Sequence, residues 1–499
     1  MKTEKNIGNS FKPSKYQQAI YDFITKEKGN AVVEAVAGSG KTTTIVEATK
    51  QIPQGDSAIF VAFNKSIATE LSKKLPYSVK AKTLHSLGYG MFFSNSPNKV
   101  TLDNDKLGRI IIDVMKEEKN INFHERDEMI VFLKVIIPKI KATLSDVNMD
   151  ALSQLANEYN IFYNITEETV EIIEKILNKC LSDTSVIYFD DMIWIPVMMK
   201  YRSKKYDWVF VDESQDLNKS QFELIKMLCN GGTRIIAVGD SRQAIYGFRG
   251  ADSNSMDNFR NHFSAKELPL SITYRCPKSV TELAQQFVAN IEPADDAQDG
   301  LVDSMTTATM LESAKEGELI ICRTNAPLVS VALNLIKMRK KVVVLGKDIG
   351  KNIIKIIDSQ KAYDKQELIR KISSFEREQE KLLDMIERGT YNKKHKARVL
   401  NNIDSAVIIL TIGAQANSVQ EIRNILLELF SDKKDGIVCS SVHKAKGLEN
   451  KTVYILGYHE LMPHPMAETA EEINQEYNMK YVAVTRAKEN LHLVTYTGE

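Results

Sequence analysis

Short apolar runs alternate with amphipathic stretches in the first part of the chain. These runs are rich in Val, Ile, Phe and Ala and are bounded by Gly, Pro or polar residues, which is typical of buried strands. They cover residues 31–35, 57–63, 79–83, 208–211 and 234–238. The stretch 66–75 between two of them has helical character and stops at Pro76. Strands that alternate with helices predict a parallel sheet covered by helices.

A second region of the same kind lies toward the C-terminus. Its strand-like runs cover residues 318–322, 341–345, 436–440, 452–456 and 491–496. Strand-like runs are absent from about 92 to 183, where apolar residues such as Ile110, Ile111, Val114 and Met115 follow a helical period. A third change of composition covers about 349 to 434, which is charged and helical in pattern.

The segment 349–434 carries an apolar seam. Steps of 4, 3, 4, 3 and 4 residues separate Leu368, Ile372, Phe375, Gln379, Leu382 and Ile386. A matching apolar set comprises Val419, Ile422, Ile425, Leu426 and Leu429. This spacing predicts an antiparallel helical hairpin that packs on itself, so that residues 352–432 could be replaced by a linker. The basic stretch 393–398 leaves open an arm that contacts protein or DNA.

These patterns predict an α/β protein with two α/β domains and two mainly helical insertions. The first domain is expected at 1–91 and 184–273, with its insertion at 92–183. The second domain is expected at 274–348 and 435–499, with its insertion at 349–434.

Composition narrows the class of protein. The chain has 499 residues, of which 43% are hydrophobic, and it carries 66 basic and 65 acidic side chains. This balance neither supports nor excludes a nucleic-acid partner, because a local groove can be basic on a neutral protein. The five cysteines show no metal-binding spacing, and no apolar run is long enough for a signal peptide or a membrane span. We expect a soluble, cytoplasmic protein with no membrane partner.

A phosphate-binding loop follows the first apolar run. Residues 35–42 read Ala-Val-Ala-Gly-Ser-Gly-Lys-Thr, with Ala35 in place of the usual first glycine. Glycines let backbone N–H groups approach phosphate oxygens, and the following helix N-terminus favours an anion. In such a loop Lys41 binds the β- and γ-phosphates and the Thr42 hydroxyl binds Mg²⁺.

An acidic segment, Asp-Glu-Ser-Gln-Asp at 212–216, follows the run 208–211. Open parallel sheets bind ligands at the carboxyl ends of their strands, where Asp212 and Glu213 are expected. Asp212 can hold Mg²⁺ through water, and Glu213 can orient and deprotonate an attacking water. Together the two segments predict hydrolysis of a nucleoside triphosphate.

Further segments determine the type of ATPase. They are Tyr16–Ile20, Ala62–Lys65, Thr83–His85, Val238–Ala251, Thr273–Pro277, Ser441–Glu449 and Tyr481–Lys488. In order and wording they resemble the superfamily 1 DNA helicases of the UvrD/Rep/PcrA type. The resemblance runs from about residue 13 to 490, apart from the two insertions.

The resemblance implies two RecA-like P-loop domains that bind ATP and Mg²⁺ in the cleft between them. On this template Gln17, or else Gln18, reads the adenine edge, and Tyr274 stacks on the ring. The ATP-binding loop comprises Ala37, Gly38, Ser39, Gly40, Lys41, Thr42 and Thr43. Thr43 replaces the arginine that many relatives carry. The same template implies that Gln243, Arg275 and Arg486 reach the γ-phosphate, and that Glu449 links the ATP and DNA sites.

The resemblance also places single-stranded DNA on both domains. The residues expected to contact it are Phe63, Asn64, Thr83, His85, Tyr246, Phe248, Arg249 and His443. Phe248 stands where tryptophan is common in the family. Aromatic side chains suit this task because stacking tolerates any base.

The sequence therefore predicts an ATP-dependent DNA helicase that translocates on single-stranded DNA with 3′→5′ polarity and acts on partly duplex DNA. We expect a monomer, and the 349–434 insertion is a candidate contact for a replication or repair protein. Three alternatives remain: a translocase that displaces bound proteins without much unwinding, a non-motor scaffold with a weak ATP site, and a small-molecule kinase. The sequence does not choose among DNA repair, replication and recombination.

Overall fold

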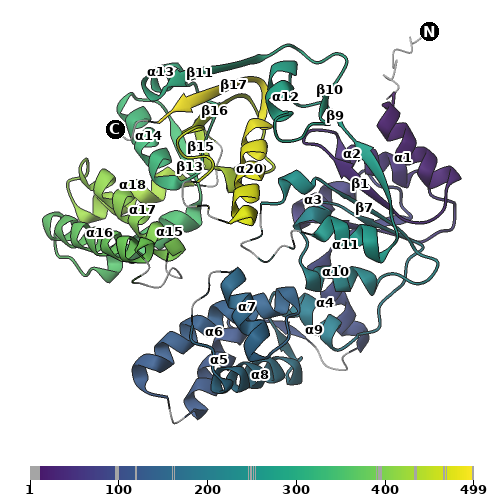
Figure 1. Cartoon of the computed structure of the whole chain (residues 1–499), viewed down its shortest axis with the longest axis horizontal. Coiled ribbons are helices and arrows are strands. Elements are labelled where there is room, and N and C mark those ends of the chain that lie inside the picture. Colours follow the sequence, from purple (N-terminus) through teal and green to yellow (C-terminus); the bar gives the residue numbers. More distant parts are fainter. Residues whose placement is uncertain are drawn as a thin grey trace, which may run out of the picture. The chain divides into compact units, whose positions relative to one another are not determined.

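The computed structural model describes residues 12–496 except 96–99, 119–120, 160, 162, 246, 248–249, 251, 253, 389, 391–395, 432–434, 465–466 and 468. The chain divides into two compact units, whose helices and strands are labelled in Figure 1. The first unit comprises 1–100, 191–241 and 251–273, and the second comprises 101–190, 242–250 and 274–499. This division does not test the predicted domain boundaries, which stay a prediction.

A parallel sheet forms the centre of the first unit. In the described residues its strand order is β3-β2-β6-β7-β1-β8, and every neighbouring pair is parallel. The strands are β1 (Ala31–Ala35), β2 (Ala58–Ala62), β3 (Val79–Thr83), β6 (Trp208–Val211), β7 (Arg234–Gly239) and β8 (Lys266–Leu270). Since β6, β7 and β1 are neighbours, the segments that follow them meet at one edge of the sheet.

Helices cover both faces of this sheet. One face packs on α1 (Lys15–Lys26), α2 (Lys41–Thr49) and α3 (Lys65–Leu71). The opposite face packs on α4 (Leu84–Asn95), α9 (Asp191–Met198), α10 (Lys219–Lys226) and α11 (Ser255–His262). Along β1 the side chains of Ala31 and Val33 belong to the first core and Val32 to the second, as the two-residue period of a strand requires.

Arg234 closes the C-terminal end of α1. Its guanidinium donates to the backbone carbonyls of Phe23, Ile24 and Gly29 over distances of 3.2, 3.0 and 2.9 Å. The same group lies over the rings of Phe23 and Trp208. Helix carbonyls at a C-terminus lack partners within the helix, so this arginine satisfies them and ties α1 to the start of β7.

Arg234→Ala should lower the stability of the first unit by about 2 kcal/mol, because it leaves helix-end carbonyls without a charged donor. Arg234→Lys is the matched variant, since it keeps the charge but not the planar fork, and it should lose roughly half as much. Urea unfolding followed by tryptophan fluorescence measures both effects. Equal midpoints for the wild type and the alanine variant would contradict this role.

The second unit contains another parallel sheet. In the described residues the order is β11-β17-β16-β12-β15-β13-β14. The strands are β11 (Leu301–Thr306), β12 (Leu319–Cys322), β13 (Val342–Leu345), β14 (Phe430–Ser431), β15 (Ile437–Ser441), β16 (Asn450–Leu456) and β17 (Ala487–Thr495). The helices α12 (Lys278–Ala284), α13 (Thr307–Ser313), α14 (Asn325–Lys337), α19 (Val442–Ala445) and α20 (Ala470–Val484) accompany this sheet. The predicted fold class, α/β with parallel sheets flanked by helices, is confirmed.

Four helices occupy the described residues of the predicted charged insertion. They are α15 (Lys347–Ser359), α16 (Lys365–Glu387), α17 (Lys396–Gly413) and α18 (Val419–Leu429). The predicted seam is present, since Leu368, Ile372 and Ile386 on α16 are buried. Its partner differs from the prediction: α16 packs along α17, with Asn402 donating to Gln379 at 3.0 Å, whereas α18 packs on α15.

The inserted helices do not close their apolar core alone. Buried residues of α15 to α18 belong to the same hydrophobic cluster as β12, β13, β15 and α14. Phe430, directly after α18, begins a strand that pairs with β13. Replacing residues 352–432 by a linker would therefore remove part of the core of the second unit, contrary to the expectation of a self-contained hairpin.

A carboxylate of α17 caps a helix of this sheet. Asp404 accepts a hydrogen bond of 3.0 Å from the backbone N–H of Ala326, at the N-terminus of α14. The N-cap residue Thr324 makes no side-chain cap of its own. Burial raises the pKa of Asp404 to about 6, although the backbone N–H groups of Ala326 and Asn325 lower it. The insertion thus supplies the missing cap.

Asp404→Ala should destabilise the second unit by about 1–2 kcal/mol, the usual loss for an N-cap. Asp404→Asn keeps an acceptor and should lose less. Because the folded pKa lies above the unfolded one, the wild type loses stability as the pH rises from about 4 to about 6, and the neutral asparagine does not. Urea unfolding at pH 5 and pH 7 measures this, and wild-type stability relative to the asparagine variant should be greater at pH 5. The opposite order would contradict the raised pKa that burial gives to Asp404.

The predicted first insertion is helical. It contains α5 (Lys106–Glu117), α6 (Phe123–Thr143), α7 (Met149–Glu158) and α8 (Glu167–Ser182), with β4 (Thr101–Leu102) and β5 (Val186–Ile187) pairing at its base. In the described part of the chain, no helix combines the length and apolarity that crossing a bilayer requires.

Candidate nucleotide-binding site

The loop after β1 has the backbone of a phosphate-binding loop. Gly38 and Gly40 adopt φ values of 75° and 74°, which only glycine adopts without strain. Ala35 is still part of β1 and is not at positive φ, so this position does not need the usual glycine. The Ser39 hydroxyl is buried without a hydrogen-bond partner, which fits a loop that surrounds a bound oxygen ligand.

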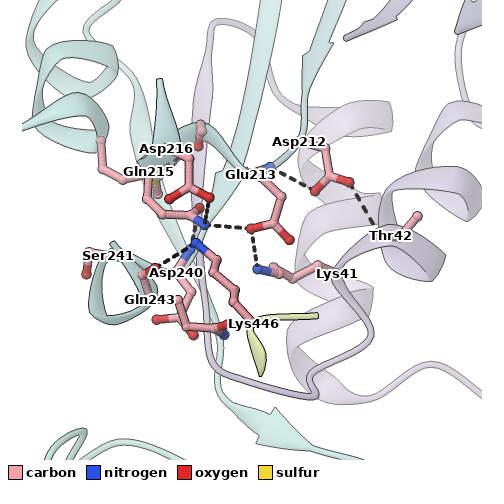
Figure 2. Close-up of polar contacts among 12 residues, drawn as sticks. Lys41, Thr42, Asp212, Glu213, Gln215, Asp216, Asp240, Ser241, Gln243 and Lys446 are labelled. Atoms are coloured by element: carbon pink, nitrogen blue, oxygen red, sulfur yellow. Dashed lines mark hydrogen bonds and ion pairs between the residues drawn. The ribbon is translucent and has the colours of Figure 1, made fainter. Parts of the chain in front are cut away.

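Lys41 begins α2 and faces the acidic segment after β6 (Figure 2). Its ammonium nitrogen lies 3.2 Å from Glu213 Oε2. Burial lowers the pKa of Lys41, but the carboxylates of Glu213, Asp240 and Asp212 raise it more, so that its pKa lies above the usual value. The lysine is therefore charged and is held by Glu213 in this state.

Asp212 and Thr42 form the candidate cation site. Thr42 Oγ1 lies 3.5 Å from Asp212 Oδ2, at the long limit of a hydrogen bond. Burial and the neighbouring Glu213 carboxylate raise the pKa of Asp212. A hydroxyl and a carboxylate are ligands that Mg²⁺ accepts, and a cation would offset the negative charge of this site.

The composition of the site fits a cation that arrives with a polyphosphate. Three carboxylates, those of Asp212, Glu213 and Asp240, lie near the single positive charge of Lys41. The negative charge of a bound polyphosphate would therefore need a cation to compensate it. Among the described residues no three His, Cys, Asp or Glu side chains form a metal-binding group. Mg²⁺ keeps several waters and binds through one or two carboxylates plus substrate phosphates, which matches these ligands.

Glu213 is held in an unusual backbone conformation. Its φ of 49° places a residue with a side chain in the left-handed region, which costs about 1–2 kcal/mol. The short helix η1 (Ser214–Asp216) follows it directly, and Asp216 donates its N–H to the Glu213 carbonyl at 3.0 Å. This turn directs the Glu213 carboxylate toward Lys41.

Gln215 and Asp240 complete this cluster, although no role was predicted for them from the sequence. Gln215 contacts Glu213 and the backbone of Asp240, which follows β7. Both residues belong to segments already recognised, 212–216 and 238–251. The adjacency of β6 and β7 was the signal that could have identified them.

In the second unit the candidate residues Arg275 and Glu449 lie together. Arg275 Nε donates to Glu449 at 2.7 Å, and Lys488 pairs with the same carboxylate. Burial raises the pKa of Glu449, but hydrogen bonds and charges from Lys488 and Arg275 outweigh it, so that the pKa is lowered. Arg486 is buried and donates to the carbonyls of Val482 and Leu448.

Two other residues of this unit have candidate roles. Tyr274 is 52% exposed and lines a cavity of about 410 Å³ together with Arg275, Pro277 and Gln298. Gln243 is buried in a short helix of residues 241–243, and its carbonyl accepts from Lys446 at 2.7 Å. An exposed ring beside a cavity is available for stacking, and the predicted contact of Tyr274 with the adenine ring stays a prediction.

Gln17 lies on the first unit and is committed to protein contacts. Its Oε1 accepts from the Ser14 N–H at 2.9 Å, and its Nε2 donates to Thr44 Oγ1 on α2 at 3.0 Å. Gln18 is exposed and contacts Asp22. Gln17 therefore links α1 to the phosphate-binding helix, and its predicted contact with adenine stays a prediction.

The predicted DNA residues of the first unit follow the outer strands. Phe63 comes after β2 and is 48% exposed, so its ring does not belong to the core. Asn64 caps α3 through the Ile67 N–H, and Thr83 at the end of β3 accepts from the Ser86 N–H. Burial lowers the pKa of His85 to about 4, so this ring is neutral near pH 7.

The other predicted DNA residues are His443, Tyr246, Phe248 and Arg249. His443 is half-buried in α19. Tyr246, Phe248 and Arg249 lie outside the described residues. Their contacts with nucleic acid stay a prediction.

Comparison with known proteins supplies independent evidence. Residues 16–264 match the family model of the UvrD/REP helicase N-terminal domain, and residues 436–494 match that of the UvrD-like helicase C-terminal domain. The segment between the two matches contains the charged insertion.

Similar whole proteins carry helicase names. An F-box DNA helicase protein 1 of Schizosaccharomyces pombe is 25% identical over 92% of the chain. An ATP-dependent DNA helicase PcrA of Staphylococcus epidermidis is 24% identical over 95%, and a probable DNA helicase II homolog of Mycoplasma capricolum is 24% identical over 93%. The chain spans 55% of the first relative's length and 82% of the other two.

Proposed function

The chain belongs to the UvrD/REP helicase family, and we propose that it is an ATP-dependent DNA helicase. It hydrolyses ATP, moves along single-stranded DNA in the 3′→5′ direction and separates the strands of a duplex. The observation that carries the proposal is the cluster of Lys41, Thr42, Asp212 and Glu213 at the carboxyl ends of β1 and β6. The polarity rests on the family resemblance.

Each residue of this cluster has a separate task in hydrolysis. Lys41 leaves Glu213 and binds the phosphates of the substrate, and the glycine loop presents its backbone N–H groups to them. Glu213 then accepts the proton of a water that it orients toward the γ-phosphorus. Thr42 and Asp212 would hold Mg²⁺, which supplies charge neutralisation on the phosphate oxygens.

Arg275 and Arg486 are proposed to stabilise the charge that develops on the γ-phosphate. A guanidinium suits this task because it is planar, always charged and bidentate toward oxygen. In the described structure Arg275 is held by Glu449, so it must exchange this carboxylate for phosphate oxygens during turnover. Arg486 lies deeper and would need a rearrangement of the 485–486 turn.

DNA is proposed to bind along the edge that also carries the nucleotide cluster. Phe63 follows β2 and Thr83 ends β3, and these are the outer strands on one side of the same parallel sheet. An exposed ring can stack on any base, which suits a motor without sequence preference.

The ATPase rate measured with and without single-stranded DNA tests this proposal. We expect DNA to raise kcat, because a translocase hydrolyses ATP fastest while it is bound to single-stranded DNA. Phe63→Ala is the test variant for DNA binding, because it removes an exposed ring. It should raise the DNA concentration needed for stimulation by roughly 5- to 150-fold, as loss of one stacked base does. A rate that DNA does not change would contradict the helicase assignment and favour a scaffold or a small-molecule kinase.

A further inference from the structure

Gln215 is buried between the candidate general base and the neighbouring strand end. It is 1% exposed, and both of its polar atoms are used. Nε2 donates to Glu213 Oε2 at 2.5 Å and to Asp216 Oδ2 at 3.4 Å, while Oε1 accepts from the Asp240 N–H at 3.0 Å (Figure 2). The backbone donor fixes which end of the amide is oxygen, so the NH₂ group must face the two carboxylates.

Packing leaves this amide little freedom. A Cβ built on Gly239, the last residue of β7, would lie 2.5 Å from Gln215 Oε1, 2.7 Å from Met256 Sδ and 2.9 Å from Ser214 Oγ. The backbone of β7 therefore approaches the side chain as closely as a glycine permits. A buried, fully bonded and sterically enclosed amide holds its partners in one position.

Glu213 Oε2 has a second partner, Lys41 Nζ at 3.2 Å. Lys41 is proposed to turn to phosphate when ATP binds, and this contact is then lost. Gln215 has no such second task, because its other end is bound to a backbone N–H. It is therefore a contact that can keep the Glu213 carboxylate in place during hydrolysis, on a backbone that is already at a φ of 49°.

We propose that Gln215 is a positioning residue that holds Glu213 in the orientation of a general base once Lys41 has moved to the substrate. It acts through Glu213 and does not itself touch ATP. The inference rests on the proposed hydrolysis of ATP. The Asp240 N–H holds the amide in place. Because the Glu213 backbone is strained at its positive φ, its carboxylate should shift when the amide is removed.

Two variants separate the two ends of the amide. Gln215→Met has a similar length and makes neither hydrogen bond. Gln215→Glu keeps an acceptor for the Asp240 N–H but replaces the donor to Glu213 with a like charge. Gln54→Met is the matched control, because Gln54 is an exposed residue of the same unit. The readouts are kcat, the ATP dissociation constant and the melting temperature.

We expect both Gln215 variants to lower kcat by roughly 10- to 100-fold, which is the loss of one hydrogen bond to a charged group. The ATP dissociation constant should stay within about threefold of the wild-type value. This change is smaller than the change that loss of one such hydrogen bond to ATP would cause. Gln215→Glu should also lower the melting temperature more than Gln215→Met does, because it buries a further carboxylate beside Glu213 and Asp216. Gln54→Met should match the wild type in every readout.

The double variant Glu213→Gln/Gln215→Met gives the sharpest test. If Gln215 acts through Glu213, adding Gln215→Met to Glu213→Gln should lower kcat no further. A full additional loss in the double variant, a normal kcat in folded Gln215→Met, or a loss confined to ATP affinity would each overturn the inference. If the wild type hydrolyses ATP without stimulation by DNA, the helicase proposal fails, and the inference is judged on the basal kcat.

Discussion

Glu213→Gln should lower kcat by roughly 10²- to 10⁴-fold, because an amide cannot accept the proton of the attacking water. ATP binding should be unchanged or tighter. In the structure the Glu213 carboxylate holds Lys41 at 3.2 Å, and a neutral amide would release this ammonium to the phosphates. Single-turnover hydrolysis together with fluorescent-nucleotide titration measures both quantities.

Lys41→Ala is the matched contrast for Glu213→Gln. It removes the positive partner from the same ion pair and should weaken ATP binding as well as stop turnover. Opposite effects of the two variants on ATP affinity would support separate roles for the two residues. A Glu213→Gln protein that turns over at near the wild-type rate would show that another group is the base.

Arg275→Ala is expected to have the second large effect, a loss of kcat of up to ~10³-fold or more, as for other arginines that stabilise a transferring phosphoryl group. Arg275→Lys keeps the charge but loses the fork that contacts Glu449, and should recover only part of the rate. Steady-state ATPase measurements on saturating DNA give the values.

Binding of single-stranded DNA without nucleotide is the control for Arg275. Its affinity should change little in both variants, because the proposed role concerns only the phosphates. An equal loss of DNA affinity and kcat in Arg275→Ala would instead place this arginine on the DNA or in the fold, for example as the counter-charge of Glu449.

The sequence could predict those site residues whose positions depend only on a local pattern of neighbouring residues. Gly38 and Gly40 indicate a loop with positive φ angles, which the structure has. Asp212 and Glu213 follow an apolar run whose composition predicts a buried strand. Parallel strands align their carboxyl ends, so the meeting of Lys41 with Glu213 followed from topology alone.

Residues whose roles depend on packing were missed. Gln215 became visible only when the order of β6 and β7 was known. The helix α17 was not recognised as the partner of α16, because its buried residues, among them Val399, Ala406, Ile408, Ile409 and Ile412, face several neighbours and form no single stripe. The strand β11 lies at a sheet edge and is largely polar, so it lacked the apolar signal of its neighbours.

The helical insertion also differs from its sequence pattern in a way that affects function. A self-contained hairpin could move or be removed as a unit, whereas helices that share a core with the sheet and cap α14 through Asp404 are part of the second unit. We therefore expect changes at 349–434 to act on the motor through stability as well as through any partner that binds there.

Strand separation on tailed duplexes tests the central claim most directly. With ATP and Mg²⁺, the wild-type protein should separate a short duplex that carries a single-stranded 3′ tail and leave a 5′-tailed or blunt duplex intact, while Glu213→Gln should bind the tailed substrate without separating it. Absence of strand separation on both tailed duplexes, at protein and ATP concentrations where hydrolysis is stimulated by DNA, would contradict a helicase and favour a translocase that displaces bound proteins.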